Sequence, residues 1–401
     1  MLLNKKPLKD KLVSKRIRGE KWDYKQVNTM VKRMYVVTPW EVKGVVDYKD
    51  LIKQFGLKPL NEEILTRIKK YTGNLHYLLK RRIFFAHRDL DWLLNEYEKG
   101  NKFYLYTGRG PSGHVHLGHL VPWILTKWLQ DNFDVKLYFQ ITDDEKFLFK
   151  DLDLEKVKSF AYDNILDIIS LGFDPEKTFI FLDTEYGKTL YKEAIRVAKH
   201  ITFSTAKAVF GFKNESNIGE IFFTSIQAVP AFLESVKEGR NVPCLIPLAV
   251  DQDPHFRVAR DVLPKLGYYK PALIHSKFLP GLGKGGKMSS SNPETAIFTL
   301  DTPDQIEKKI RNAYDGGQPT LKEQREKGGD PAICPVYQYY FFLFEPDDRK
   351  IKEIYTECKA GERICGDCKQ VLAARVKKFI AEHQKKREKA KNVIDKFMLR
   401  D

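Results

Sequence analysis

Apolar residues in the middle of the chain alternate between two spacings. Short apolar or aromatic runs, typical of buried strands, occupy residues 103–107, 135–142, 178–182, 244–250 and 272–279. Between these runs, apolar side chains recur at helical intervals, most clearly over residues 154–169. Strands that alternate with helices predict crossover connections, and therefore an α/β fold with a mainly parallel sheet. Ligands of such sheets bind at the carboxyl ends of the strands, so we expect functional residues just after each run.

The alternation is absent from both ends of the chain. The segments KPLNEEILTRIKKYT and DLDWLLNEYEKG precede the first predicted strand and are typical of short helices. Helical patterns also dominate after residue 300, for example in DQIEKKIRNAY and in the final basic segment. We therefore predict three parts: a basic N-terminal extension with an appended segment (residues 1–95), an α/β domain (residues 96–300) and a helical C-terminal domain (residues 301–401).

Composition places the chain among globular proteins. Hydrophobic residues make up 42% and aromatic residues 12% of the 401 residues, enough to bury a large core. No apolar run in the sequence reaches the roughly 18 residues that a membrane span requires. The N-terminus is basic and lacks the apolar stretch of a secretory signal. We expect a soluble, cytoplasmic protein that does not enter a membrane.

The charge of the chain favours a polyanionic partner. A formal net charge of +16 attracts nucleic acids, although ordinary basic enzymes share such a charge. Residues 1–33 carry eleven Lys/Arg against three acidic residues, and residues 375–401 carry ten against four. Basic ends are often solvated tails or helix faces, so they gain meaning only beside other signs of nucleic-acid binding.

The first candidate site follows the run at residues 103–107, where the chain reads TGRGPSGHVHLGHL. Its glycines permit a tight backbone, and His116 and His119 open a predicted helix. A helix N-terminus offers free N–H groups and a positive partial charge, which suit a phosphate. Gly118 lacks a side chain, so a nucleotide could pack against the backbone there. A metal-binding histidine pair or a chance histidine-rich turn would show the same short pattern.

The second candidate site is a glycine-rich loop after the last predicted strand, which reads KGGKMSSSNP. Lys287 places a point charge on a flexible stem, suited to a developing phosphoryl charge. Ser289, Ser290 and Ser291 add hydroxyl donors. Taken alone, such a loop is more often a plain surface loop.

Together the two segments resemble the HIGH and KMSKS signatures of class I aminoacyl-tRNA synthetases, and they stand in that family's order. Two alternatives remain, the tyrosyl-tRNA synthetase sister family and a non-catalytic RNA-binding relative, although the latter need not retain His116, His119 and Lys287. Further segments resemble tryptophanyl-tRNA synthetases of the archaeal/eukaryotic type, over nearly the whole chain from about residue 33: TPWEVKG, YTGRGPSG, TDDEKFLFKDL, GFDPEKTFIF, IQAVPAF and CLIPLAVDQDPHFRVARD.

The resemblance implies a Rossmann-like catalytic domain with a connective insertion, followed by an α-helical anticodon-binding domain. It implies a ligase that uses ATP and Mg²⁺ to convert tryptophan to tryptophanyl-adenylate, with release of pyrophosphate. Tryptophan then passes to the 3′-terminal adenosine of tRNA(Trp). The resemblance also implies a homodimer, and the basic ends would contact the tRNA backbone.

The resemblance assigns roles to individual residues. Tyr106 and Gln140 would receive the indole N–H, although Tyr106 could be a plain strand aromatic. Glu145, Gln227 and Gln252 would hold the α-amino group, although Glu145 could pair only with a neighbouring lysine. The complete sets are His116, His119, Lys287 and Ser289 for catalysis; Arg109, Gly110, Gly118, Met288, Ser290 and Ser291 for ATP; and Tyr106, Gln140, Thr142, Glu145, Lys146, Gln227 and Gln252 for tryptophan.

Four of the five cysteines lie near the C-terminus, at Cys334, Cys358, Cys365 and Cys368. The last two form a Cys-x-x-Cys pair, the commonest half of a zinc or iron–sulfur site. Some tryptophanyl-tRNA synthetases resemble this spacing, and an iron–sulfur cluster is the suggested occupant there. Four unpaired thiols are the alternative. Cys244 starts an apolar run and is expected to be a buried core thiol.

Overall fold

The computed structural model describes residues 36–37, 42–43 and 46–401, and its centre is a seven-stranded sheet. The strand order is β3-β4-β9-β8-β5-β6-β7, and the neighbours from β9 to β7 are parallel. The predicted mainly parallel sheet is therefore confirmed. Its strands are β3 (Lys58–Pro59), β4 (Phe84–Arg88), β5 (Tyr104–Arg109), β6 (Leu137–Ile141), β7 (Thr178–Leu182), β8 (Cys244–Ala249) and β9 (Ala272–Ser276).

Two strands of this sheet come from the segment that we assigned to the N-terminal extension. β3 pairs antiparallel with β4, and β4 pairs antiparallel with β9. β4 has five residues, of which the first four are buried, so it lacks the alternation of buried and exposed positions that reveals a half-buried strand. The sheet therefore begins before residue 96, in a part of the chain where the sequence indicated only helices.

The first described residues form a short, separate β-ribbon. β1 (Val36–Val37) and β2 (Val42–Lys43) pair antiparallel outside the main sheet. The basic segment 1–33 and most of the TPWEVKG segment lie outside the described residues.

Side chains alternate across the sheet and supply two core clusters. Leu105 and Phe139 point into one cluster, whereas Tyr104, Tyr106 and Tyr138 point into the other. The first face is covered by α4 (Glu62–Thr72), α6 (Leu90–Glu98), α7 (Leu117–Phe133) and α9 (Leu154–Ser170). The second is covered by α10 (Gly187–Ala198), α11 (Phe203–Phe210), α12 (Ile218–Ile226), α13 (Leu233–Glu238) and α14 (Asp253–Val262). Three short helices complete this part of the chain: α5 (Tyr77–Lys80) packs in the first cluster, α8 (Asp143–Phe149) lies against the second, and α3 (Tyr48–Phe55) packs in a small third cluster.

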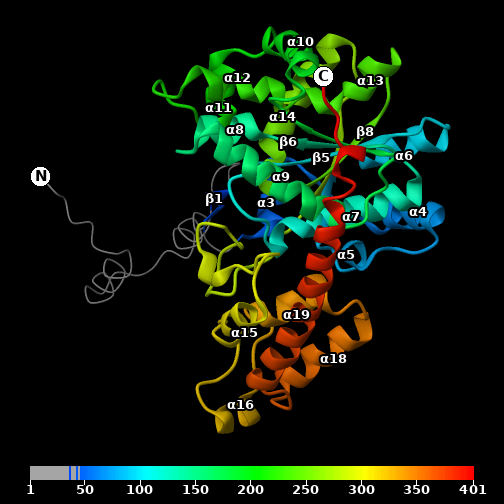
Figure 1. Cartoon of the computed structure of the whole chain (residues 1–401). Coiled ribbons are helices and arrows are strands. Elements are labelled where there is room, and N and C mark those ends of the chain that lie inside the picture. The colour runs from blue at the N-terminus through cyan, green and yellow to red at the C-terminus, as the bar shows by residue number, and fades with distance from the viewer. Residues whose placement is uncertain (1–35, 38–41, 44–45) are drawn as a thin grey trace, which may run out of the picture.

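The helical C-terminal region predicted after residue 300 is present, and Figure 1 shows it below the sheet. Its last helix runs from that region back along the α/β part, where it packs on α9. The chain then ends beside β7, because Ile180 N donates to Phe397 O and Leu399 N donates to Ile180 O, both at 2.7 Å. The helices are α15 (Pro303–Arg311), α16 (Leu321–Lys327), α17 (Pro335–Tyr339), α18 (Asp348–Lys359) and α19 (Cys365–Ala390).

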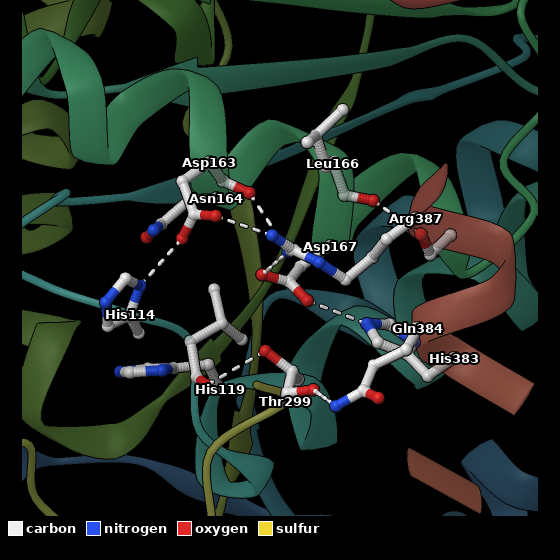
Figure 2. Close-up of polar contacts among 12 residues, drawn as sticks. His114, His119, Asp163, Asn164, Leu166, Asp167, Thr299, His383, Gln384 and Arg387 are labelled. Carbon is white, nitrogen blue, oxygen red and sulfur yellow. Dashed lines mark hydrogen bonds and ion pairs between the residues drawn. The ribbon is translucent and has the colours of Figure 1, made fainter. Parts of the chain in front are cut away.

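The contact between α9 and α19, which we call the α9/α19 junction, is a network of buried charges (Figure 2). Arg387 of α19 lies 2.5 Å from Asp163 Oδ1 and also pairs with Asp167. His383 Nε2 lies 2.7 Å from Asp167 Oδ1. One turn of α9 therefore supplies two carboxylates for the two basic side chains of α19.

Within residues 36–37, 42–43 and 46–401, no helix combines the length and apolarity needed to span a membrane.

Candidate active site

The strand order changes direction between β5 and β8. From β5 the chain continues to β6 and β7 on one side, and then crosses to β8 and β9 on the other. Ligands of open α/β sheets bind at such a switch point. β5 and β8 pair at Tyr104–Cys244 and Leu105–Leu245, near their starts, and a cleft of about 440 Å³ opens beyond the carboxyl ends of the two strands.

The cleft gathers nearly all of the predicted site residues outside the cysteine cluster. Two of the seventeen do not line it: Gln140 is fully buried behind the wall, and Lys146 lies against Glu145. The residues on the wall are Tyr106, Arg109, Gly110, His116, Gly118, His119, Thr142, Glu145, Gln227, Gln252, Lys287, Met288, Ser289, Ser290 and Ser291.

The two histidines meet at the start of α7. His116 is the N-cap residue and His119 lies three residues later, so the imidazole rings stack with their centroids 3.5 Å apart. His116 N donates to His119 Nδ1 at 3.1 Å. A Cβ on Gly118 would lie 3.1 Å from His116 Nδ1 and 3.5 Å from Met288 Cβ, so glycine allows this close approach of the two motifs.

Both rings are neutral at physiological pH. Burial, followed by the charge of Arg109, lowers the pKa of His116 to about 3. The same two causes lower the pKa of His119 well below its ordinary value. Since His119 Nδ1 accepts a hydrogen bond, the single proton of this neutral ring lies on Nε2. His119 Nε2 lies 3.1 Å from Arg109 Nη1, so the imidazole and the guanidinium stand side by side on the cleft wall, where an anionic oxygen could approach both.

Arg109 is a half-buried cation without a carboxylate partner among the described residues. Its Nε donates to Asn164 Oδ1 at 2.8 Å, and its other contacts are His119 Nε2 and the Gly113 carbonyl. No carboxylate of the described residues lies in ion-pair range of it, and burial lowers the pKa of Arg109 to about 10. A cation withdrawn from solvent normally has a counter-charge, so an anion from outside would complete this site.

The glycine-rich loop brings Lys287 to the opposite wall. Lys287 Nζ lies 2.8 Å from Asp251 Oδ2, and the other oxygen of this carboxylate is buried without a hydrogen-bond partner among the described residues. Met288 is buried, and its N–H donates to Leu279 O at 3.0 Å. Ser289 and Ser291 bond to each other through their hydroxyls at 2.8 Å. The loop therefore places the Lys287 ammonium group where it could contact the phosphates of a nucleotide.

The far end of the cleft is a chain of oriented hydrogen bonds. Gln227 Nε2 donates to Tyr106 Oη at 2.7 Å, and Tyr106 Oη donates to Gln140 Oε1 at 2.5 Å. Gln140 Nε2 lies 2.9 Å from both carboxyl oxygens of Asp183. Tyr106 is thus part of a polar network, which is more than a plain strand aromatic would make.

Glu145 has two partners beside the cleft. Its Oε1 lies 2.5 Å from Lys146 Nζ, and its Oε2 accepts from Thr142 Oγ1 at 2.6 Å. Burial raises the pKa of Glu145, but Lys146 and Thr142 outweigh it and hold the pKa below its ordinary value. The pairing with a neighbouring lysine, left open above, is therefore observed, and the carboxylate remains on the cleft wall.

Sequence reasoning missed three residues that organise the cleft. Asp183 follows β7 directly and Asp251 follows β8, so the expectation that functional residues lie at strand ends could have identified both. Asn164 lies inside α9, and nothing in the helical pattern distinguishes it from a core position.

The four C-terminal cysteines line one small cavity together with Asp315 and Arg363. Burial first, then the neighbouring carboxyl and thiol groups, raise the pKa of Cys365 to about 12. In the part of the chain that the structure describes, no group of three or more His, Cys, Asp or Glu side chains has the arrangement of a metal site. Cys244 is a buried thiol, as expected.

The family model for class I tRNA synthetases of the W and Y type matches residues 98–381. The chain belongs to the tryptophanyl-tRNA synthetase family. It is 55% identical to the tryptophan–tRNA ligase of Thermococcus kodakarensis over 367 residues, which is 90% of this chain and 94% of that relative. Identity to the tryptophan–tRNA ligase of Pyrobaculum calidifontis is 51%, over 91% of this chain and 98% of the relative.

Solved structures of the family share the fold. The tryptophanyl-tRNA synthetase of Plasmodium falciparum superposes with a TM-score of 0.80 at 42% identity, over 86% of this chain and 92% of that one. The tryptophan-bound enzyme of Encephalitozoon cuniculi gives a TM-score of 0.81 at 38% identity, over 88% and 98% of the chains. The family membership explains why a Rossmann-like sheet and a helical C-terminal region occur together.

Proposed function

We propose that this protein is a tryptophan–tRNA ligase that activates tryptophan with ATP and transfers it to tRNA(Trp). One observation carries the proposal: Arg109, with no carboxylate of the described residues in ion-pair range, lies beside His119 at the N-terminus of α7, in the same cleft as Lys287. Three groups that favour phosphate oxygens thus surround one space. The oriented amides at the other end of the cleft fit the amino acid.

The first step joins tryptophan to ATP. A carboxylate oxygen of tryptophan attacks the α-phosphorus, the bond to the bridging oxygen breaks, and pyrophosphate leaves with Mg²⁺. His116, His119 and Arg109 would hold the phosphates, and Lys287 would stabilise the charge that develops on them. Met288 and Gly118 form the wall against which the nucleotide would lie. Lys287 must leave Asp251 to do so, and Ser289 to Ser291 would close with it.

The second step transfers tryptophan from the adenylate to tRNA. By class I chemistry, the 2′-hydroxyl of the terminal adenosine attacks the carbonyl carbon and AMP leaves. The helical C-terminal region would bind the anticodon, with the basic residues of 375–401 along the RNA backbone. Aminoacylation should therefore weaken as salt rises. The protein would act in the cytoplasm, where its tRNA is.

Amino-acid-dependent exchange of pyrophosphate into ATP tests substrate and activity together. We expect exchange with tryptophan and none with tyrosine. Exchange with tyrosine alone would identify the sister specificity, and tRNA binding without any exchange would identify a non-catalytic relative. Lys287→Ala should lower the exchange rate by about 10²–10³-fold while tryptophan affinity is kept. An unchanged rate would remove Lys287 from this role.

The oligomeric state belongs to the same proposal. Large apolar side chains are exposed on neighbouring helices, with Tyr191 of α10 60% exposed and Ile218 of α12 84% exposed. A homodimer joined across this face would bury them. Light scattering should give a dimer for the native chain and a monomer for Ile218→Lys.

A structural metal centre at the four cysteines is the second part of the proposal. The thiols line one cavity, and glycines leave room beside them: a Cβ on Gly317 would lie 2.5 Å from Cys365 Sγ, and one on Gly329 would lie 2.8 Å from Cys358 Sγ. A bound cation would favour the thiolates that burial now disfavours. Four thiolates suit zinc or an iron–sulfur cluster.

Metal analysis of protein purified without oxygen distinguishes these occupants. Zinc in the colourless protein would identify a zinc site, and iron with brown colour would identify a cluster. Cys365→Ala should lose the metal, whereas the matched variant Cys244→Ala, at a buried thiol elsewhere, should keep it. Metal-free, colourless native protein would leave four free thiols.

A further inference from the structure

A buried carboxyl lies directly behind the far end of the cleft. Asp183 is the first residue after β7, and its N–H donates to Ile141 O of β6 at 3.1 Å. The side chain is 4% exposed, and both of its oxygens lie 2.9 Å from Gln140 Nε2. The adjacent strand therefore places this carboxyl against Gln140, which is itself fully buried.

This contact determines which way the Gln140 amide points. A carboxyl oxygen accepts hydrogen bonds, so the NH₂ end of Gln140 must face Asp183. The opposite end, Oε1, then faces Tyr106 Oη at 2.5 Å and Gln227 Nε2 at 3.3 Å, which are both donors. A flipped amide would place its oxygen against the carboxyl oxygens and its NH₂ against the Gln227 NH₂. Both contacts would be repulsive, so the observed orientation is strongly preferred.

The protonation of Asp183 does not weaken this preference. Burial, and then the neighbouring Asp144 carboxyl, raise the pKa of Asp183 well above its ordinary value, and burial raises the pKa of Asp144 to about 7. A neutral Asp183 carboxyl still has a carbonyl oxygen, and both of its oxygens lie 2.9 Å from Gln140 Nε2, so an acceptor is present in either protonation state. The face toward Gln140 remains an acceptor.

We propose that Asp183 is a positioning residue for substrate selection, which holds the Gln140 amide so that its oxygen, and not its NH₂, serves the amino-acid pocket. This rests on the proposed function, in which Tyr106 and Gln140 receive the indole N–H. The pocket then selects an aromatic side chain that presents a hydrogen-bond donor. An isosteric ring without a donor makes no hydrogen bond to the Tyr106–Gln140 pair and therefore binds more weakly.

The experiment compares two amino acids in pyrophosphate exchange with the full-length protein. One is tryptophan, and the other is 3-(3-benzothienyl)-L-alanine, in which sulfur replaces the indole N–H. For Asp183→Leu, which removes both acceptors at similar size, the KM for tryptophan should rise roughly ten- to a hundredfold. The KM for the sulfur analogue should change less than about threefold, and kcat with tryptophan should be kept within about threefold.

Two further variants keep the test decisive. Asp183→Asn should behave like the native chain, because its NH₂ can turn to Asp144 while its oxygen still accepts from Gln140. Asp143→Asn is the matched control: Asp143 is also buried and accepts from Thr184 N at 3.2 Å, but it has no bond to Gln140. It should leave the ratio of the two KM values unchanged. If Asp183→Leu does not fold, Asp183→Ala carries the same expectation.

The outcomes separate this inference from the proposed function. A native chain without tryptophan-dependent exchange would overturn the proposed function. Native discrimination against the sulfur analogue that persists in Asp183→Leu would overturn the positioning role alone. An equal rise of both KM values in Asp183→Leu would show general disturbance of the pocket and would also overturn it.

Discussion

Two arginines withdrawn from solvent, one buried and one half-buried, have different partners in two regions of the molecule. Arg387 in the α9/α19 junction is 5% exposed and has carboxylates from Asp163 and Asp167 (Figure 2). Arg109 on the cleft wall is half-buried, and its partners are an amide, an imidazole and a carbonyl. Removing a cation from water costs free energy unless a counter-charge is present. The junction supplies that charge from within the chain, whereas the described residues of the cleft place no carboxylate within ion-pair range of Arg109.

The two regions share helix α9, which makes the comparison a close one. Asp163 and Asp167 of α9 face the arginine of the junction, and Asn164 between them holds the arginine of the cleft. One helix thus provides carboxylates on one side and a neutral amide on the other. A carboxylate at position 164 would neutralise Arg109 and compete with phosphate.

The largest effect should follow from breaking the junction. Arg387→Met leaves Asp163 and Asp167 without their cation, and we expect the free energy of unfolding to fall by about 3–5 kcal/mol in urea denaturation. Exchange activity per folded molecule should stay near the native value. Neutralising the carboxyls as well, in Arg387→Met with Asp163→Asn and Asp167→Asn, should restore most of the stability. A native-like stability of the single variant would contradict the comparison.

The matching change in the cleft should act on function and not on stability. Arg109→Gln removes a cation that has no carboxylate partner, so the free energy of unfolding should be unchanged or higher. The kcat/KM for ATP in pyrophosphate exchange should fall by about 10²–10³-fold, because the phosphates lose a charged donor. If Arg109→Gln loses stability as Arg387→Met does, the distinction between the two arginines is wrong.

Lowering the pH should reduce the free energy of unfolding, because the histidines of the cleft are neutral in the folded chain. The pKa of His116 is about 3 in the folded chain and 6.5 ordinarily, so the unfolded chain takes up the proton first. This stabilising contribution is complete above pH 6.5 and is lost as the pH falls toward 3. The variant His116→Asn keeps a residue that favours the N-cap position. Between about pH 6 and 4.5, its free energy of unfolding should fall by about 1–2 kcal/mol less than that of the native chain. If urea denaturation shows the same fall for the native chain and for His116→Asn, the His116 ring is not held neutral by the fold.

The smallest effect should come from the exposed side of α19. Lys385 and Lys386 are exposed, whereas His383 and Arg387 on the same helix are buried in the junction. Lys385→Ala with Lys386→Ala should raise the KM for tRNA by about threefold and reduce its salt dependence. Pyrophosphate exchange without tRNA should not change. An altered exchange rate would mean that the exposed side of α19 also supports the cleft.

Much of the fold was predictable because its signals are local. The runs that became β5 to β9 are short, apolar and bounded by turns, and the helix over residues 154–169 repeats at 3.6 residues. β3 and β4 were not predicted, because two residues are too few for a pattern and a strand buried on both faces shows no alternation. The return of residues 397–399 to β7 was also invisible, since it joins positions more than two hundred residues apart.

The sequence by itself determined the central strands and helices, the order of the TGRGPSGHVHLGHL and KGGKMSSSNP segments and the set of residue types available to the cleft. Periodicity and turn residues act over a few neighbouring positions, so they can be recognised directly in the sequence. Only the tertiary structure decided which charges are matched. Arg109 and Arg387 are alike as residues, and their difference arises because folding places Asn164 beside one and Asp163 and Asp167 beside the other. Burial then makes each choice of partner energetically decisive, since charges in a dry interior lack the screening that water provides.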